Sequence, residues 1–429
     1  MAARSYDVIV VGARVAGAVT ALLLARQGLR VLAVDRATFP SDTLSTHQIQ
    51  VPGVARLHRW GLLDRLAATG TPATREVRFD PGPAVLVGRF PMYEGVDALY
   101  SPRRTVLDAL LVDAARQAGA EVRENYLVEE LHWVDGRVAG IRGHERGAKP
   151  CTETAPLVVG ADGKHSLVAK AVAARRYRYR PPATLACYTY WSGMPAGSTG
   201  ELYQRPGRAV AAFPTNDGLT MVYVAAPVAE LPAFRADVPG RYLETLDRCG
   251  DLGQRVRAGE RAERWRTTPD LPTAFRVPYG PGWALVGDAG LVMDPVSAQG
   301  ISNALRDADL LAGAVLDAGL AGDHGLAGDQ RLAGYHRSRD RAGRPMDDFT
   351  ARLARLGAPG WRERALLTSL VGRPAEIDRL LGVFAGIEPL RRYFSLPNAL
   401  RLILDKRLPT ERQAVRRAKR RAERRARRT

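Results

Sequence analysis

Two glycines and an acidic residue near the start of the chain have the spacing of a nucleotide-binding turn. One apolar run, Tyr6–Val11, leads into Gly12 and Gly17, and a second run, Arg30–Val34, closes with Asp35. Gly12 would allow a tight turn, and free N–H groups at the start of the following helix suit a pyrophosphate. Asp35 can accept hydrogen bonds from an adenosine ribose. The residues expected to bind a dinucleotide here are Gly12, Ala13, Arg14, Val15, Ala16, Gly17, Asp35 and Arg36.

Arg14 departs from the pattern, because it occupies the place of the middle glycine in G-x-G-x-x-G. Glycine at that place lets a diphosphate approach the backbone closely. An arginine must either point its side chain away or supply a cation to the phosphate. Taken alone, the motif is weak, and an ordinary strand–turn–helix is the alternative.

Two further acidic residues follow apolar runs that are typical of buried strands. Leu157–Gly160 is followed by Asp162-Gly163, and Trp283–Gly287 by Asp288. Ligands of open α/β sheets bind beyond the carboxyl ends of the strands. Asp288 is therefore placed to bind the hydroxyl groups of a polyol. A helix expected from about Gln299 would present its N-terminus at Gly300, where its partial positive charge suits a developing anion.

Short buried strands and amphipathic helices must position these residues. A helix is expected from Ala18 to Gln27, between the first two strands. After Gln299 the apolar residues have helical spacing at 301, 304, 305, 308, 311, 312, 315 and 316. Alternating strands and helices predict an α/β fold with a Rossmann-like domain.

In their order and spacing, the three segments resemble the FAD-dependent monooxygenases of the p-hydroxybenzoate hydroxylase-like (group A flavoprotein) superfamily. The resemblance covers roughly residues 5–345. It implies that Asp288 and Pro295 bind the ribityl chain and flank the flavin ring. Arg104, with Arg103 as the fallback, is similar to an arginine that lies near the FAD pyrophosphate. The further cofactor-binding residues implied are Arg104, Val128, Asp162, Gly287, Asp288, Pro295, Gln299, Gly300 and Ile301.

Other positions differ from the family pattern and leave the reaction class open. Gln299 and Gly290 replace the usual glycine and histidine, and Ala169 stands where an arginine is often found. A halogenase should have a Trp-x-Trp-x-Ile-Pro segment, which Tyr190–Pro195 does not match.

The resemblance implies an enzyme that hydroxylates or epoxidises an aromatic or polycyclic small molecule with NAD(P)H and O₂. A role in secondary metabolism, such as antibiotic biosynthesis, is expected. The catalytic candidates are Pro295, which would shape the flavin site, and His47, which would contact flavin or substrate. A hydrogen-bonded loop histidine is the plainer explanation of His47. Since no second dinucleotide fold is visible, NAD(P)H would bind transiently, or a partner reductase would supply electrons.

Two alternatives stay open. Asp294-Pro295 also fits an FAD-dependent reductase or dehydrogenase of the geranylgeranyl reductase type. Arg14 and the basic C-terminal tail would fit a basic binding protein with a vestigial flavin fold.

The middle of the chain predicts an antiparallel sheet. Thr184–Trp191 alternates, with Tyr188 and Tyr190 on one face, and residues 215–218 form a plausible hairpin loop between 208–214 and 219–225. This sheet resembles the family's substrate domain. The candidates for an aromatic and apolar substrate pocket are Tyr190, Phe213, Met221 and Tyr223, with ordinary core residues as the alternative.

A length of 429 residues exceeds one ordinary domain. The FAD-binding domain is expected at residues 1–75, 98–183 and 276–345, and the substrate domain is expected as an insertion at 76–97 and 184–275. A helical region, 346–410, and a basic tail, 411–429, complete the chain. Helices in residues 330–408 are expected to break at Pro345, Pro359, Pro374, Pro389, Pro397 and Pro409.

Charge and cysteine content bound the partners and the compartment. The net charge is +18, of which the tail, with ten Lys/Arg and two Glu, contributes +8. The tail has no aromatic residue for base stacking, so a solvated tail is favoured over an acidic carrier protein as partner, and specific nucleic-acid binding is not expected. Gly12, Arg14 and Gly17 interrupt the apolar stretch 8–25, which argues against a membrane span. Three distant cysteines favour a reducing cytoplasm, and seven scattered histidines predict no metal site.

Overall fold

A largely parallel sheet of very short strands lies at the centre of the first part of the molecule. The computed structural model describes residues 6–194, 198–317 and 326–404. Every residue of the first two strands is buried, which suits runs of valine, leucine and isoleucine. The sheet has the order β20 (Tyr279–Gly280), β21 (Trp283–Leu285), β11 (Leu157–Gly160), β1 (Val8–Val11), β2 (Val31–Val34) and β7 (Glu121–Arg123), and only β20 is antiparallel.

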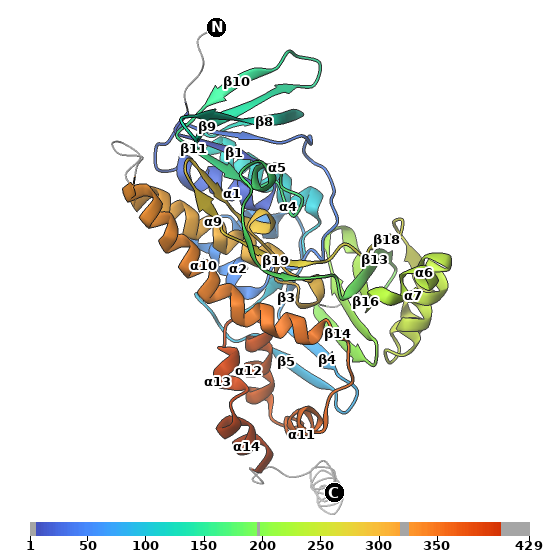
Figure 1. Ribbon diagram of the computed structural model, residues 1–429. Helices are drawn as coiled ribbons and strands as arrows, with labels where there is room; N and C mark the ends of the chain where they lie inside the picture. Colours follow the sequence, from blue (N-terminus) through green and yellow to red (C-terminus); the bar gives the residue numbers. More distant parts are fainter. Residues whose placement is uncertain (1–5, 195–197, 318–325, 405–429) are drawn as a thin grey trace, which may run out of the picture.

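The two faces of this sheet are covered by different layers (Figure 1). Val8 and Val10 pack in one core cluster with helices, whereas Ile9 and Val11 pack in another with antiparallel strands. Residues that alternate along a strand point to opposite faces, so each strand contributes to both cores. The helices are α1 (Val15–Ala25), α4 (Arg104–Gln117) and α9 (Gly300–Asp317), and the strands are β8 (Tyr126–Val134), β9 (Arg137–Glu145) and β10 (Cys151–Thr154).

An eight-stranded sheet forms the second part of the molecule. Neighbouring strands run antiparallel except β4 and β14, which are parallel, so the sheet is mixed and not wholly antiparallel as the sequence suggested. Its order is β17 (Glu260–Arg261), β13 (Thr184–Ser192), β16 (Thr220–Pro227), β15 (Arg208–Pro214), β14 (Thr199–Arg205), β4 (Glu76–Asp80) and β5 (Leu86–Arg89), and β18 (Arg266–Thr268) also pairs with β13.

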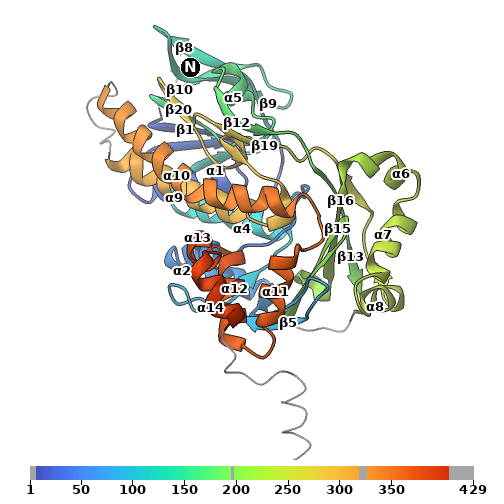
Figure 2. The same cartoon turned by 60° about the horizontal axis from the view of Figure 1, so that its bottom comes forward.

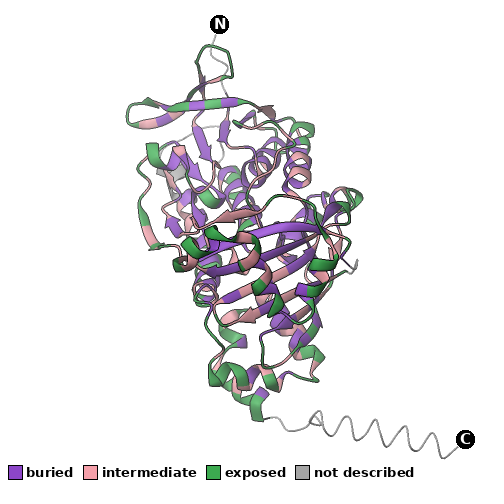
Figure 3. Cartoon of the chain, turned by 90° about the vertical axis from the view of Figure 1, so that its right-hand side faces the viewer, coloured by how far each residue is buried: buried purple, intermediate pink, exposed green. Residues whose placement is uncertain are grey.

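The central strands of the eight-stranded sheet are buried on both faces, as the purple colouring in Figure 3 shows. Helices α6 (Leu231–Ala236), α7 (Val238–Asp247) and α8 (Leu252–Ala258) cover the outer face (Figure 2), where Cys187 is buried. Tyr188 and Tyr190 lie in the cluster of the opposite face, with Val296 and Leu356. The alternation predicted for β13 is therefore confirmed.

Five helices follow α9 in the described part of the chain: α10 (Leu326–Leu353), α11 (Trp361–Ser369), α12 (Pro374–Ala385), α13 (Leu390–Tyr393) and α14 (Leu396–Leu404). Helix α10 packs against α9, and the later ones pack at the edge of the eight-stranded sheet formed by β4 and β5. The predicted break at Pro345 is wrong, because Pro345 lies inside α10. A proline removes one helical hydrogen bond, but buried Met346 and Phe349 hold the next turn of α10 in the core. Pro409 and the tail lie outside the described residues.

Smaller elements connect these layers. They are α2 (Val51–Arg59), α3 (Leu63–Ala68), β3 (Ala73–Thr74), β6 (Leu99–Tyr100), α5 (Leu167–Ala171), β12 (Arg176–Arg180), β19 (Thr273–Arg276) and β22 (Leu291–Val292). Within the described ranges, none of the helices combines the length and apolarity that crossing a membrane requires.

Candidate cofactor and substrate sites

The residues expected to bind a cofactor gather at one edge of the parallel sheet. Strands β1, β2, β11 and β21 all run in the same direction. Gly12, Asp35, Asp162 and Asp288 follow these strands, each within three residues of the strand's end. Segments that are far apart in the sequence therefore meet where ligands of open α/β sheets bind.

The turn after β1 depends on its two glycines. Gly12 has a φ of +98°, a backbone conformation that other residues rarely adopt. A Cβ atom added to Gly17 would lie 1.7 Å from the carbonyl oxygen of Gly12. The tight turn and the close approach of α1 to β1 predicted from these positions are both confirmed.

Asp35 closes this turn through its carboxylate. Its Oδ2 accepts a hydrogen bond from the backbone N–H of Ala13 at 2.7 Å, and its Oδ1 accepts one from Ala37 at 2.8 Å. Asp35 is buried, whereas Arg36 is exposed beside it. Asp35 thus ties the end of β2 to the start of α1. Binding of a ribose by Asp35, and any cofactor contact of Arg36, stay predictions.

Arg14 points its side chain toward helix α4. Its Nη1 donates to Asp108 Oδ2 at 2.5 Å, and its Nη2 donates to the hydroxyl of Ser41 at 3.0 Å. Arg104 donates to the same carboxylate, from Nε at 3.0 Å and from Nη2 at 2.9 Å. Two guanidinium groups thus share one buried carboxylate, which leaves one net positive charge beside the turn.

Two carboxylate groups at this edge have unused hydrogen-bonding capacity. Asp162 Oδ2 accepts from the backbone N–H groups of Leu167 and Val168 at the start of α5, but its Oδ1 is buried without a partner. Asp288 accepts no hydrogen bond from the described residues, and solvent reaches the residue at the edge of the sheet. The protein packed around its carboxyl group nevertheless removes much of the solvation of the charged form, and this desolvation raises the pKa of Asp288 to about 6. Free acceptors at this edge fit the hydroxyl groups of a bound FAD.

A tight turn connects β22 to helix α9. Asp294 Oδ1 accepts from the N–H of Val296 at 2.9 Å and begins the 3₁₀ turn Pro295–Ser297, and Ala298 follows with a φ of +52°. The amide of Gln299 donates to the carbonyl of Phe384 in α12 at 2.9 Å. Gln299 thus anchors this turn to the C-terminal helices, which the sequence did not indicate. Gly300 is exposed at the start of α9, Ile301 is buried, and Gly287 begins the turn after β21 with a φ of +59°.

His47 is fully buried, with a φ of +63°. Its Nε2 lies 2.7 Å from the hydroxyl of Tyr190, and its Nδ1 has no partner among the described residues. Burial lowers the pKa of His47 to about 3, so its imidazole is neutral at physiological pH. The hydroxyl of Tyr188 accepts from the N–H of Ser45 at 3.2 Å. These two tyrosines thus hold the loop that carries His47 against the eight-stranded sheet, and a catalytic role of His47 stays a prediction.

A cavity of about 120 Å³ lies between the eight-stranded sheet, the turn at Pro295 and the C-terminal helices. Its lining combines segments that are far apart in the sequence. The lining residues are Thr46, Gln48, Gln50, Phe79, Leu202, Tyr203, Gln204, Ala209, Val210, Ala211, Met221, Tyr223, Pro295, Val296, Ser297, Ala298, Phe349, Leu353, Leu356 and Phe384.

Two of the four predicted substrate residues, Met221 and Tyr223, line this cavity. Tyr190 is instead paired with His47, and Phe213 packs where a Cβ on Gly200 would lie 2.2 Å from its ring. Val128 belongs to the core between the parallel sheet and β9. The glutamines of the lining, Gln48 and Gln50 before α2 and Gln204 in β14, were missed, because no sequence pattern marks which polar side chains line a cavity.

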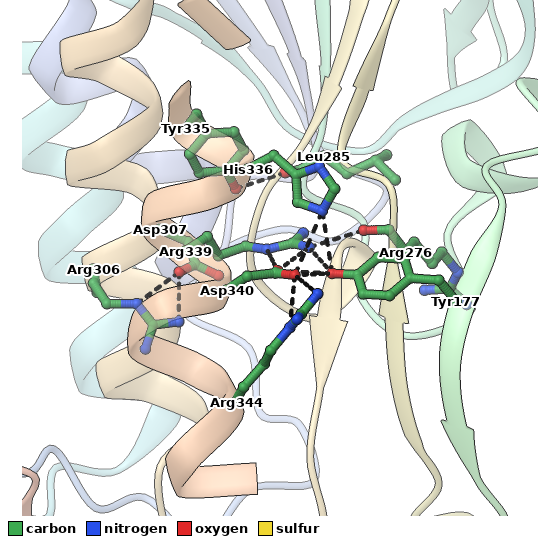
Figure 4. Close-up of polar contacts among 10 residues, drawn as sticks. All are labelled: Tyr177, Arg276, Leu285, Arg306, Asp307, Tyr335, His336, Arg339, Asp340 and Arg344. Carbon is green, nitrogen blue, oxygen red and sulfur yellow. Dashed lines mark hydrogen bonds and ion pairs between the residues drawn. The ribbon is translucent and has the colours of Figure 1, made fainter. Parts of the chain in front are cut away.

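A buried ionic cluster braces the turn after β21 (Figure 4). Arg276 Nη1 donates to the carbonyl of Ala289 at 2.8 Å, next to Asp288, and its Nη2 donates to the carbonyl of Lys164 at 3.2 Å. Arg339 of α10 donates to the carbonyl of Arg276 at 2.9 Å and to the hydroxyl of Tyr177 at 2.8 Å. Arg276 therefore joins the segments that carry Asp162 and Asp288.

Comparison with known proteins places these features in context. The model of a family described as "FAD binding domain" matches residues 5–237. The chain is 29% identical over 345 residues to 3-amino-4-hydroxybenzoate 2-monooxygenase of Streptomyces cremeus, covering 73% of this chain and 80% of that protein. It is 30% identical over 338 residues to menaquinone reductase of Mycolicibacterium smegmatis, covering 71% of this chain and 75% of that protein.

The fold also matches that of solved structures. The myxobacterial chondrochloren halogenase CndH, an FAD-dependent halogenase, superposes with a TM-score of 0.74 and 21% identity, covering 95% of this chain and 98% of that chain. At this level of identity the match shows a shared fold and no shared reaction.

Proposed function

The chain belongs to the p-hydroxybenzoate hydroxylase-like family of FAD-dependent monooxygenases, and on that premise we propose that it hydroxylates an aromatic or polycyclic small molecule with O₂ and NAD(P)H. It is an FAD-dependent oxidoreductase. The proposal concerns the substrate, the electron donor and the position of the site. Epoxidation of a similar substrate is chemically close and would use the same residues.

One observation carries the proposal: the cavity and the edge of the parallel sheet share the segment that connects β22 to α9. Pro295 lines the cavity, and Gly300, five residues later, begins α9. A cofactor bound by Asp288 and by the start of α9 would thus lie beside whatever fills the cavity. Asp288 would bind the ribityl hydroxyls of FAD and Pro295 would contact its ring.

When bound, FAD supplies the transfer of electrons from NAD(P)H to O₂ and of one oxygen atom to the substrate. The turn at Gly12 and the N-terminus of α1 bind the diphosphate, with Arg104 and Arg14 adding positive charge. The N–H groups at the start of α9 stabilise negative charge on the flavin ring. The apolar walls of the cavity exclude water from the reacting atoms.

His47 has a supporting role in this proposal. Its neutral imidazole and the hydroxyl of Tyr190 share a hydrogen bond at 2.7 Å. Since its pKa is lowered to about 3, His47 neither adds positive charge to the site nor acts as a proton donor near neutral pH. It would fix the loop that passes between the sheet and the cofactor. NAD(P)H would bind transiently, because in the described residues the strand–turn–helix at Gly12 is not repeated around a second parallel sheet.

A test of the proposal uses FAD-loaded protein, NADPH or NADH, and ¹⁸O₂ with a panel of phenols, naphthols and polycyclic ketones. The expected result is a product that carries one ¹⁸O atom from O₂. A substrate that is consumed without gaining ¹⁸O would contradict the proposal.

A reductase is the second candidate, because of the 30% identity to menaquinone reductase. This candidate predicts that a quinone or an isolated double bond is reduced at the expense of NAD(P)H under anaerobic conditions. The monooxygenase predicts no substrate conversion when O₂ is removed. The two functions are therefore separated by one anaerobic control.

A further inference from the structure

Among the described residues, those that line the cavity beside Pro295 include no charged one. All of its polar lining residues in the described chain are uncharged: Thr46, Gln48, Gln50, Gln204, Ser297 and the two tyrosines, Tyr203 and Tyr223. The remaining lining residues are apolar. A carboxylate that moved from water into such walls would lose its solvation without gaining a cation, which is a large cost. This lining therefore discriminates against ionised ligands.

Three charged residues close to Pro295 or His47 are engaged elsewhere. Asp294 accepts from the hydroxyl of Thr184 at 2.7 Å and from Val296 N–H at 2.9 Å. Arg103 lies over the ring of Tyr190, 4.9 Å from its centroid, and forms an ion pair with Glu263. Arg104 is bound to Asp108. None of these charged groups is free to pair with an ionised ligand in the cavity.

Two lining side chains retain unused hydrogen-bond donors. The hydroxyl of Tyr223 and the amide Nε2 of Gln48 are both buried without a hydrogen-bond partner among the described residues. Tyr223 is 4% exposed, and burial raises the pKa of its phenol well above 10, so the hydroxyl keeps its proton. An unpaired buried donor is costly, so both groups gain most from an occupant that offers an acceptor.

Two other residues of the lining, Tyr203 and Gln204, do use their hydrogen-bond donors. The hydroxyl of Tyr203 donates to Glu201, and the amide of Gln204 donates to the carbonyl of Gly357 at 3.2 Å. Unpaired donors are thus a property of Gln48 and Tyr223, and not of every polar residue in the lining.

We propose, on the basis of the function proposed above, that the substrate is an uncharged, largely apolar ring compound that carries a carbonyl-type acceptor for Tyr223 and Gln48. The acceptor sets the orientation of the substrate, and the apolar walls select its uncharged form. This cavity disfavours aromatic carboxylates, even though the relatives of the chain include an enzyme named for a hydroxybenzoate.

Binding of a matched pair of probes tests this inference on FAD-loaded protein at pH 7. The probes are 7-methoxycoumarin, which is uncharged and has a ring carbonyl, and its 3-carboxylate, and binding is followed by equilibrium dialysis. The expected dissociation constant of the carboxylate is at least tenfold higher. The inference is overturned if the carboxylate binds as tightly, or if 7-methoxycoumarin does not bind up to its solubility limit.

Tyr223→Phe and Tyr203→Phe form a matched pair of variants for the same probe. Tyr223→Phe is expected to raise the dissociation constant of 7-methoxycoumarin at least threefold, whereas Tyr203→Phe leaves it within twofold. Equal effects of the two variants would overturn the role of Tyr223.

Urea denaturation without ligand distinguishes a hydroxyl that lacks a hydrogen-bond partner from one that has a partner. Removing the unpaired hydroxyl in Tyr223→Phe should raise the urea midpoint of the protein, and removing the paired one in Tyr203→Phe should lower it. A lower midpoint for Tyr223→Phe would contradict the inference. If these results fail while ¹⁸O₂ is still incorporated into another substrate, the proposed function stands and only the substrate class is wrong.

Discussion

Nη1 of Arg14 lies 2.5 Å from Oδ2 of Asp108, which joins the start of helix α1 to helix α4. The side chain of Asp108 is 0% exposed, and that of Arg14 is 26% exposed. Since Arg104 binds the same carboxylate, Asp108 holds both arginines beside the nucleotide-binding turn. The arginine that replaces a glycine in this turn is thus accommodated by a partner 94 residues away.

Asp108→Asn should destabilise the protein more than Arg14→Gln does. Removing the carboxylate leaves the buried guanidinium of Arg104 uncompensated, at a cost of about 3–5 kcal/mol in the free energy of unfolding. Arg14 is partly exposed, so its loss should cost about 1 kcal/mol or less. Urea denaturation of the two variants without FAD checks this order. Equal costs would mean that the pair with Asp108 does not support the fold.

Gly17→Ala should prevent the turn after β1 from forming. The added Cβ would lie 1.7 Å from the carbonyl oxygen of Gly12, a distance that requires the backbone to move. The Gly17→Ala variant is therefore expected to contain no bound FAD after purification. Gly313→Ala is the control, because no atom lies within 4 Å of its added Cβ, and alanine inside helix α9 should stabilise the protein by about 0.5–1 kcal/mol. FAD retained by Gly17→Ala at the wild-type level would show that this approach is not essential.

Arg339→Lys should weaken the brace on the turn after β21. Arg339 is 0% exposed and reaches Tyr177, Asp340 and the carbonyl of Arg276 at once, which a lysine cannot do. The expected loss in the free energy of unfolding is about 1.5–3 kcal/mol. Arg344→Lys is the matched control, since Arg344 binds the same Asp340 but is 53% exposed, and it should cost less than about 1 kcal/mol. Chemical denaturation of both variants distinguishes the buried contact from the surface one.

The protein should lose stability in acid because of His47. The pKa of His47 in the folded state is lowered to about 3, so the unfolded chain takes up a proton at a higher pH than the folded protein does. The free energy of unfolding therefore keeps its full value above the unfolded pKa of about 6.5 and decreases as pH falls from 6.5 toward 3. At pH 5 this loss amounts to about 2 kcal/mol. Asp288 acts in the opposite direction, because its raised pKa makes the folded state less stable as pH rises from about 4 to 6.

Comparison of His47→Gln with the wild type isolates the histidine. The difference between the melting temperatures at pH 7 and pH 5 should be smaller in His47→Gln. Parallel pH profiles for the two proteins would mean that His47 is not the group that titrates.

The local parts of the fold could be predicted from the sequence. Strand β1, the turn at Gly12 and helix α9 follow from apolar spacing and from glycines that local geometry requires. The four segments at the carboxyl edge of the parallel sheet were also predictable, because one strand direction brings their ends together.

Features that depend on distant partners could not be predicted. The proline in α10 is tolerated because of core contacts that no local pattern reveals. The parallel pairing of β4 with β14, and the approach of Gln48 to a cavity lined by α10, depend on how separate layers pack. Tyr190 was expected in a pocket by its place on β13, but its hydroxyl is instead paired with His47.

The central claim is that Asp288, at the end of β21, is a carboxylate that holds FAD. It is tested most directly by titrating the apoprotein with FAD and following the quenching of flavin fluorescence, for the wild type, Asp288→Ala and the control Asp309→Ala. The account predicts that Asp288→Ala raises the dissociation constant of FAD roughly 10- to 150-fold, from the loss of about 1.5–3 kcal/mol of charge-assisted hydrogen bonds, while Asp309→Ala leaves it unchanged. Wild-type affinity in Asp288→Ala would contradict the account.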